Sequence, residues 1–430
     1  MTNKQLPNNW AVTNLKNVVS PTKGKKPIRL ENSSFAESVP YIDIKALELN
    51  QINQYADIKS SKLFSKGDIA IVWDGARSGW VAKAHNGAIG STLCALTPIK
   101  IDSTYLYYYL LSKYSLINSK PRGVGIPHVD PKFLWSLEIP LPPTAEQKRI
   151  ADKLDTLFGQ LSTIQKALER IPELIKNFRQ QVLTSAVSGN LTEEWRKKQE
   201  PSQWRIKKLS DVATPKSGYP FKASDFVEQG IQVIRMGNLY NNKLSLERNP
   251  VFIPKEYNAE IINKSTIHKG DILLTLTGTK YKRDYGYAIK VDSDDTLLLN
   301  QRILALSPII NVDYLLLVLR EEDFRNHFFS FETGGVNQGN VGIKNVMTIP
   351  INVPPAKEQT KIVEITNSLF KKLETIEQQY NALKAKIEKL PQTLLNKAFS
   401  GELVDHLPSD GNAEDLLKEI EQLKRSTKKK

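Results

Sequence analysis

The chain has 430 residues, which is too long for one ordinary hydrophobic core and indicates two or more domains. Its net charge of +14 favours an anionic partner such as nucleic acid, although a charged surface that keeps the protein in solution is the alternative. The single cysteine, Cys94, excludes an intramolecular disulfide and a thiolate metal cluster, and is expected to be a small buried apolar residue. No apolar run reaches the roughly 18 residues of a membrane span, and the start lacks a signal-peptide pattern, so we expect a soluble, cytoplasmic protein.

The hydrophobic pattern predicts two mixed α/β blocks that alternate with two helical blocks. The predicted domains are residues 1–143, a helical spacer at 144–200, a second mixed block at 201–355, a second spacer at 356–405, and a helical, basic tail at 406–430. Short strands are expected at 41–47, 67–73 and 92–98, and again at 232–238, 270–278 and 301–308. Apolar-faced helices are expected at 103–119 and 312–329, each followed by a glycine-bearing loop.

The helical blocks carry apolar residues at the alternating 4-3 spacing of a coiled-coil seam. The first seam contains Ile150, Leu154, Leu157, Leu161, Ile164, Leu168 and Ile171; the second contains Ile362, Thr366, Leu369, Leu373, Ile376, Tyr380, Leu383, Ile387 and Leu390. A pair of prolines precedes each helix, and a Ser-Gly pair offers a stop at its end. We expect the two helices to pack against each other, the alternative being two amphipathic helices on separate cores.

A duplication connects the two halves. The stretch "LPPTAEQKRI" (141–150) is matched by "VPPAKEQTKI" (353–362) at a constant offset of 212, and "AVSGNL" (186–191) is matched by "AFSGEL" (398–403). Upstream, "PNNWAVTNLKNV" (7–18) resembles "PSQWRIKKLSDV" (201–212), which pairs Trp10 with Trp204. A repeat of this length indicates a duplicated domain rather than a solenoid of short units. The fold class is therefore mixed α/β, with two related globular domains and pseudo-twofold symmetry.

The sequence lacks the motifs of an enzyme. It contains no G-x-x-x-x-G-K-[ST] phosphate loop, no strand–G-x-G-x-x-G–helix unit, no Asn/Asp-Pro-Pro-aromatic tetrad, and no H-x-x-x-H or H-E-x-x-H pair for a metal. Asp68 and Asp271 each follow Lys-Gly, and we interpret both as parts of a tight turn that enters a strand. We therefore predict no catalytic residue and no metal ligand.

The repeated P-P-x-x-E-Q-x-x-I motif, the heptads behind it and the closing "SGNL" and "SGEL" resemble the DNA-specificity subunit of type I restriction-modification systems over roughly residues 5–405. The resemblance implies two target recognition domains on an antiparallel helical spacer, which read a bipartite DNA sequence. It also implies partners: double-stranded DNA, two modification (methyltransferase) subunits and ATP-dependent restriction subunits. S-adenosylmethionine, ATP and Mg would then be bound by those partners and not by this chain. The rival interpretations are a stand-alone, internally duplicated DNA-binding regulator and a fused nuclease.

Residues that contact DNA are expected in the loops of both mixed blocks, since Lys and Arg bind phosphates, Arg pairs with guanine, and Asn and Gln pair with adenine. The candidates in the first block are Arg77, Ser78, Lys120, Arg122 and His128. Those in the second block are Lys280, Tyr281, Lys282, Arg283, Tyr285, Asn300, Gln301, Arg302, Asn337, Gln338 and Asn340. A solvated turn is the alternative for each of these loops.

Residues that form the seam or contact the modification subunits are expected at the beginning of each helical block. The candidates are Glu146, Gln147, Ile150, Leu154, Leu157, Leu161, Glu358, Gln359, Ile362, Leu369, Leu373 and Ile376. Glu146 and Glu358 stand in the first turn of their helices, where a negative charge suits the helix dipole.

Overall fold

The computed structural model describes residues 6–122, 127–199, 203–335 and 338–427. The chain forms two compact units. Unit 1 comprises residues 1–169 together with 382–430, and unit 2 comprises residues 170–381. Each unit therefore contains one of the predicted mixed blocks and a part of both helical blocks.

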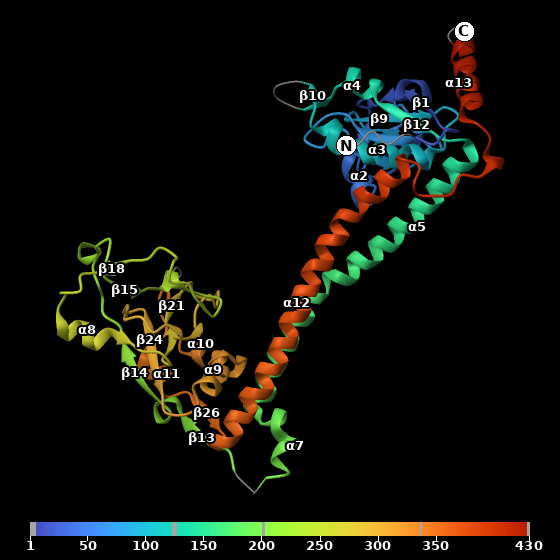
Figure 1. Cartoon of the computed structure of the whole chain (residues 1–430). Helices are drawn as coiled ribbons and strands as arrows, with labels where there is room; N and C mark the ends of the chain where they lie inside the picture. The colour runs from blue at the N-terminus through green and yellow to red at the C-terminus, as the bar shows by residue number, and fades with distance from the viewer. Residues whose placement is uncertain (1–5, 123–126, 200–202, 336–337, 428–430) are drawn as a thin grey trace. The chain divides into compact units, whose positions relative to one another are not determined.

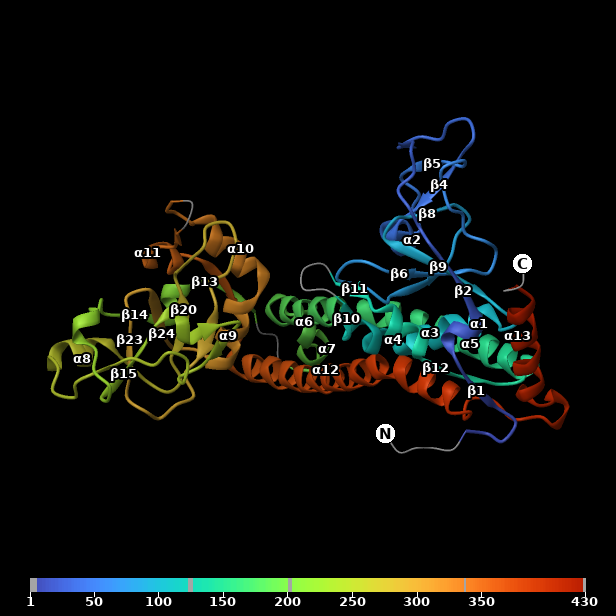
Figure 2. The ribbon, with the colours of Figure 1, turned by 90° about the horizontal axis from the view of Figure 1, so that it is seen from above.

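The strands of unit 1 form two four-stranded sheets and two short ribbons. The first sheet has the order β2 (Val19–Lys23), β9 (Leu93–Pro98), β6 (Ile69–Val72), β7 (Val81–Lys83). The second has the order β3 (Leu30–Glu31), β5 (Tyr55–Asp57), β4 (Ser38–Ile42), β8 (Ala88–Ile89). The ribbons are β1 (Ala11–Asn14) with β12 (Glu138–Leu141), and β10 (Pro121–Arg122) with β11 (His128–Val129). Figure 2 shows the second sheet at the end of unit 1 that lies away from the long helices.

The helices of unit 1 are α1 (Leu15–Val18), α2 (Ile44–Leu49), α3 (Ser103–Asn118), α4 (Pro131–Ser136), α5 (Thr144–Glu169), α13 (Ala413–Thr427) and the end of α12 (Ala356–Phe399). Helix α3 begins where predicted, because the Asp102 carboxylate accepts the backbone N–H of Tyr105 and caps the helix. Tyr105 and Tyr109 on this helix are fully buried in the main core, and both rings contact Phe399 of α12.

Unit 2 is built in a similar way, from two four-stranded sheets and short ribbons. Its first sheet has the order β14 (Ala213–Ser217), β24 (Ile303–Pro308), β20 (Ile272–Thr275), β22 (Ala288–Lys290), and its second β18 (Phe252–Ile253), β15 (Ile231–Ile234), β23 (Leu297–Leu299), β19 (Thr266–Ile267). The ribbons are β13 (Arg205–Lys208) with β26 (Pro350–Val353), β16 (Leu239–Tyr240) with β17 (Lys243–Leu244), and β21 (Thr277–Gly278) with β25 (Gly339–Asn340). The helices are α6 (Ile171–Ser188), α7 (Glu193–Arg196), α8 (Ala259–Ser265), α9 (Val312–Arg320), α10 (Glu322–Ser330), α11 (Ile343–Val346) and the start of α12. The first sheet has the same strand order in both units, which supports the predicted duplication, whereas the second sheets differ in their outer strand, since β3 pairs with β5 and β19 pairs with β23.

The long helices run antiparallel. In unit 1 the first turns of α5 share a core with the last turns of α12, through Ile150 and Leu395. In unit 2 the last turns of α6 share a core with the first turns of α12, through Leu183 and Ile362. Figure 1 shows α12 as one continuous helix, whereas the first spacer is divided at Arg170, before Pro172 in the first turn of α6. The mixed fold with two long helices is thus confirmed.

The strand expected at 270–278 is divided into β20 and β21, and three other predicted elements end or are divided at a polar side chain. The strand expected at 41–47 ends at Ile42, because the Asp43 carboxylate accepts the N–H of Ala46 and begins α2. The helix expected at 312–329 is divided at Glu321, whose carboxylate accepts the N–H of Asp323 and begins α10. The strand expected at 232–238 ends at Ile234, where Asn238 closes a short 3₁₀ turn by accepting the N–H of Arg235.

The turn interpretation of the two Lys-Gly-Asp sequences is confirmed. Gly67 and Gly270 adopt positive φ angles of 87° and 92°, which glycine tolerates. The carboxylates of Asp68 and Asp271 accept the backbone N–H groups of Ser65 and His268 across the turn, at 2.6 Å and 2.9 Å. Cys94 is buried as expected.

Candidate nucleic-acid interface and helix ends

Two of the predicted loops of unit 1 lie against each other. Asp74 in the loop 73–80 forms a backbone bridge with His128 at the end of the loop 120–128. The side chains also meet, because the Asp74 carboxylate contacts Nδ1 of His128 at 2.7 Å and accepts a hydrogen bond from Nζ of Lys23 at 2.7 Å. Burial acts to raise the pKa of Asp74, but these hydrogen bonds outweigh it and the pKa lies below its usual value. The carboxylate therefore connects the loop 73–80 to His128 and to Lys23 on β2.

The basic candidates of unit 1 are on the surface of these loops. Arg77 forms an ion pair with Glu48, and Arg122 is exposed at the start of the second loop. Nζ of Lys120 lies 4.6 Å from the centre of the Phe133 ring. Gly75 and Gly79 flank Arg77 with positive φ angles of 110° and 92°, so the loop turns back sharply on both sides of the arginine.

The corresponding loops of unit 2 meet in the same way. Strand β21, which opens the loop 277–287, pairs with β25 at the end of the loop 332–340. Nζ of Lys280 donates to the carbonyl of Gly334 at 2.9 Å, and the two loops are joined again by Glu332, whose carboxylate accepts the Tyr285 hydroxyl at 2.7 Å and the backbone N–H of Tyr281 at 3.3 Å. Each unit thus presents a composite surface formed by two paired loops.

The tip of the loop 277–287 is basic, aromatic and held in a fixed shape. Tyr281 is 78% exposed and has a φ of 66°, an uncommon angle for a bulky residue. Lys282 is exposed beside it. Arg283 also has a positive φ, and its guanidinium donates to Glu322 at 2.9 Å and to Asn326 at 2.6 Å. An open depression of about 560 Å³ beside the tip is lined by Lys280, Tyr281, Arg283, Asn326, Phe329, Ser330 and Glu332.

The remaining polar candidates of unit 2 lie close to this surface. Residues 300–302 form the turn between β23 and β24, and the carbonyl of Arg302 accepts the N–H of Leu276, next to the start of the loop 277–287. The side chains of Gln301, Arg302, Gln338 and Asn340 are exposed. Asn337 lies outside the described residues.

Three of the predicted DNA-contacting residues are buried, so the expectation that their side chains contact DNA is corrected. Ser78 has 0% exposure, because its loop folds the hydroxyl inward. Tyr285 also has 0% exposure, and its hydroxyl donates a hydrogen bond to Glu332. Burial and this hydrogen bond both raise the pKa of the hydroxyl. Asn300 is 9% exposed. Short polar and aromatic residues in a loop look the same in sequence whether they point outward or inward, so no local signal separated these three from their neighbours.

The repeated Glu-Gln pair at the helix starts is buried. Gln147 bonds to the N–H of Asp102 at 2.9 Å and to the carbonyl of Pro142 at 2.8 Å; Gln359 bonds to the N–H of Asn311 and the carbonyl of Pro354 at 3.0 Å and 2.8 Å. Asp102 and Asn311 are the N-caps of α3 and α9, so each glutamine fixes a long helix to a helix of its recognition domain. Because these side chains face inward, the structure corrects the expectation that Glu146, Gln147, Glu358 and Gln359 contact a partner subunit.

The heptad residues are only partly covered. Ile150, Leu154, Leu161, Ile362 and Leu373 are buried, and Leu157 and Leu369 are half-buried. Ile164 and Ile376, which occupy corresponding positions of the two predicted seams, are 42% and 48% exposed, so neither is covered in the way that the seam prediction expected. A straight helix drifts by about 20° per heptad, and a strict seven-residue row therefore does not stay on one face. Apolar side chains remain uncovered on both helices.

Neither a metal centre nor a membrane span is found in the part of the chain that the structure describes. No group of three or more His, Cys, Asp or Glu side chains there is arranged to hold a metal ion. None of the helices within the described ranges is long and apolar enough to cross a membrane.

Comparison with known proteins identifies the family. The fold consists of two related mixed α/β domains joined by long antiparallel helices, and the family model for the "Type I restriction modification DNA specificity domain" matches residues 7–173 and again 201–385. The chain therefore belongs to this family and carries two copies of its domain. The alternative of a stand-alone duplicated regulator is not favoured.

Curated relatives and solved structures agree with this assignment. The type I restriction enzyme MjaVIII specificity subunit of Methanocaldococcus jannaschii is 27% identical over 412 residues, covering 93% of this chain and 94% of the relative. The EcoKI specificity subunit of Escherichia coli K12 is 30% identical over 393 residues, covering 84% and 82%. The crystal structure of the HsdS subunit from Thermoanaerobacter tengcongensis superposes with a TM-score of 0.65 at 17% identity, covering 93% of this chain and 99% of that one, which supports the fold alone.

Proposed function

We propose that this chain is the non-catalytic specificity subunit of a type I restriction-modification complex, and that each unit reads one half of a bipartite DNA sequence. The observation that carries the proposal is the repetition of one loop pair in both units, each with exposed basic side chains. Two readers in one chain need not be identical, and residues 73–80 differ from residues 277–287 in sequence. The recognised sequence is therefore expected to be asymmetric, unlike the palindrome of a symmetric dimer.

The exposed candidates divide by chemistry into those that hold DNA and those that read it. Lys120, Lys280 and Lys282 suit phosphate contacts, which give affinity without sequence preference. Arg77, Arg122 and Arg302 can offer a bidentate fork to guanine, and Gln301, Gln338 and Asn340 have the amides that pair with adenine. Arg77, Arg283 and His128 are held by carboxylates of the unit, so they reach DNA only by exchanging those contacts.

The helices are the proposed docking surface for the modification subunits. Ile164 and Ile376 offer an uncovered apolar side chain at corresponding positions of the repeat, which suits two copies of one partner. S-adenosylmethionine, and the ATP and Mg used by the restriction subunits, would be bound by those partners. A complex that modifies DNA acts where the DNA lies, so we place it in the cytoplasm.

Methylation mapping tests the proposal. The chain is co-expressed with the modification subunit of the same host, and modified adenines are mapped across the genome. We expect one asymmetric sequence made of two short half-sites and an unread gap. A contiguous modified sequence would contradict the two-reader proposal, and modification that does not depend on this chain would contradict its role as specificity subunit.

A further inference from the structure

The buried glutamate at the start of each long helix is the centre of a set of hydrogen bonds that occurs in both units. We call this set a clamp; it consists of Glu146, Trp10, His406 and Gly401 in unit 1, and of Glu358, Trp204, Arg196 and Gly189 in unit 2. In unit 1 the Glu146 carboxylate accepts a hydrogen bond from Nε1 of Trp10 at 3.0 Å. In unit 2 the Glu358 carboxylate accepts one from Nε1 of Trp204, also at 3.0 Å. Both glutamates have at most 1% of their surface exposed. Each tryptophan directly precedes the first strand of its recognition domain, so the glutamate connects that strand to the start of a long helix.

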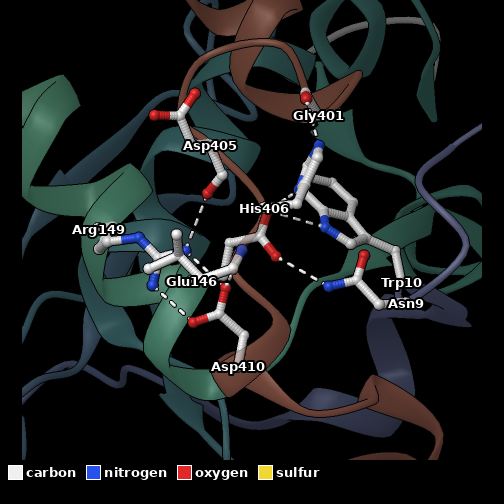
Figure 3. Close-up of polar contacts among 9 residues, drawn as sticks. Asn9, Trp10, Glu146, Arg149, Gly401, Asp405, His406 and Asp410 are labelled. Atoms are coloured by element: carbon white, nitrogen blue, oxygen red, sulfur yellow. Dashed lines mark hydrogen bonds and ion pairs between the residues drawn. The ribbon is translucent and has the colours of Figure 1, made fainter.

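A nitrogen-bearing side chain completes each clamp by connecting the glutamate to the end of the other long helix. In unit 2, Arg196 donates from Nε to Glu358 at 2.8 Å and from Nη2 to the carbonyl of Gly189 at 2.5 Å. In unit 1, Nδ1 of His406 lies 2.6 Å from Glu146, and its Nε2 lies 2.9 Å from the carbonyl of Gly401 (Figure 3). Gly189 and Gly401 are corresponding positions of the repeat, so Arg196 and His406 bridge equivalent atoms.

We propose that these clamps position each recognition domain on the helices that carry it, and that the clamp of unit 1 is controlled by a proton whereas that of unit 2 is not. Glu146 with His406, and Glu358 with Arg196, are thus positioning residues for DNA reading, and this role rests on the proposed function. The difference follows from chemistry: the guanidinium of Arg196 keeps its charge at all physiological pH values, and an imidazole does not.

The hydrogen-bonding geometry requires a proton in the clamp of unit 1. Both ring nitrogens of His406 face acceptors, namely a carboxylate oxygen and a backbone carbonyl. If Nε2–H donates to Gly401, one further proton must lie between Nδ1 and the carboxylate of Glu146. Trp10 and Asn9 also donate to that carboxylate, so His406 would be its third donor. Loss of the proton would leave a lone pair of the imidazole, which is 37% exposed, facing a lone pair of the fully buried Glu146 carboxylate.

The other charged groups around the clamp keep it attached when the proton leaves. Arg149 on α5 donates to both oxygens of Asp410 at 2.7 Å and 2.6 Å and to the carbonyl of Asp405 at 3.0 Å. The hydrogen bond from Arg149 also holds the pKa of Asp410 below its usual value, so this pair stays ionised throughout the neutral range. Deprotonation is therefore expected to loosen the segment between Gly401 and Asp410 rather than to release it.

Hydrogen exchange of the full chain tests the proposal, with a reciprocal pair of variants. Histidine changes charge near pH 6.5, so exchange is measured at about pH 6 and about pH 8.5. The rate for residues 402–410 in the native chain is divided by the rate in His406→Arg at the same pH, which cancels the intrinsic effect of pH on exchange. We expect this ratio to rise by roughly tenfold or more with pH, as for the loss of one hydrogen bond to a charged group. In Arg196→His, residues 189–199 should acquire the same dependence.

A ratio that stays constant between the two pH values, or an Arg196→His chain without pH dependence, would overturn the proton-controlled clamp. The Arg196→His arm keeps the test valid if His406→Arg fails to fold. Methylation mapping separates the clamp from the proposed function. If both are correct, raising the pH weakens discrimination in the half-site read by unit 1, and His406→Arg restores it. If exchange responds as expected while no bipartite site is modified at any pH, the clamp stands and the proposed function fails.

Discussion

The exposed lysine at the tip of the second reader allows a quantitative test of phosphate binding. Among the described residues, the side chain of Lys282 has no hydrogen-bond or ion-pair partner, whereas Lys280 is bonded to Gly334 and Arg283 to Glu322 and Asn326. Lys282→Ala should therefore remove a DNA contact without disturbing the loop. Lys255→Ala, at an exposed position of the same unit before α8, is the matched control for the loss of one charge.

The size of the effect follows from counterion release. Each neutralised phosphate contributes about −0.9 to the slope of log K against log salt. Loss of one contact should thus weaken binding roughly 15-fold at about 50 mM monovalent salt, but only about fivefold at about 150 mM. The slope itself should become shallower by about 0.9. Because a phosphate contact carries no sequence information, the modified sequence should not change.

Fluorescence anisotropy with a labelled specific duplex, measured over a salt series with the chain bound to its modification subunit, gives the slope directly. The native complex, Lys282→Ala and Lys255→Ala are compared at equal protein stability, which thermal melting establishes. An unchanged slope for Lys282→Ala would refute the assignment of this lysine to phosphate. A changed methylation sequence would instead place it among the residues that read bases.

Three further predictions concern the helices and the modular arrangement. Ile164→Asp combined with Ile376→Asp should abolish co-purification of the modification subunit with little change in the melting temperature, because both side chains are already exposed; normal assembly would refute docking at these positions. Replacement of residues 201–355 by the corresponding block of a relative should change one half-site in a methylation map and leave the other intact, and a change in both would argue against independent readers. Insertion of one heptad after Leu161 and another after Leu373 adds roughly 10 Å of helix, which corresponds to about three base pairs. If the length of the helices sets the gap between the two half-sites, the mapped sequence should gain about that many unread base pairs. An unchanged gap in an assembled complex would show that helix length does not set it.

Sequence alone was sufficient for the features that depend on local chemistry and on repetition. The offset of 212 between the two P-P-x-x-E-Q motifs established the duplication without any structural information. The helices begin directly after the paired prolines, and α6 ends before Gly189, which adopts a φ of 84°; both boundaries follow from the backbone limits of proline and glycine. The loops were found because they combine glycine with basic and aromatic residues at 277–287, with basic residues at 73–80 and 120–128, or with Asn and Gln at 333–340.

The tertiary structure decided which of these side chains are available and what the repeated glutamate does. Glu146 suited a helix start by its position alone, yet its partners are Trp10, 136 residues before it, and His406, 260 residues after it. Ser78 and Tyr285 resembled their exposed neighbours in sequence and are buried. The physical reason is that burial and long-range hydrogen bonding depend on which elements the topology brings together. Local propensity determines how a segment folds, but the other segments packed against it determine which of its groups face solvent and which must find a partner.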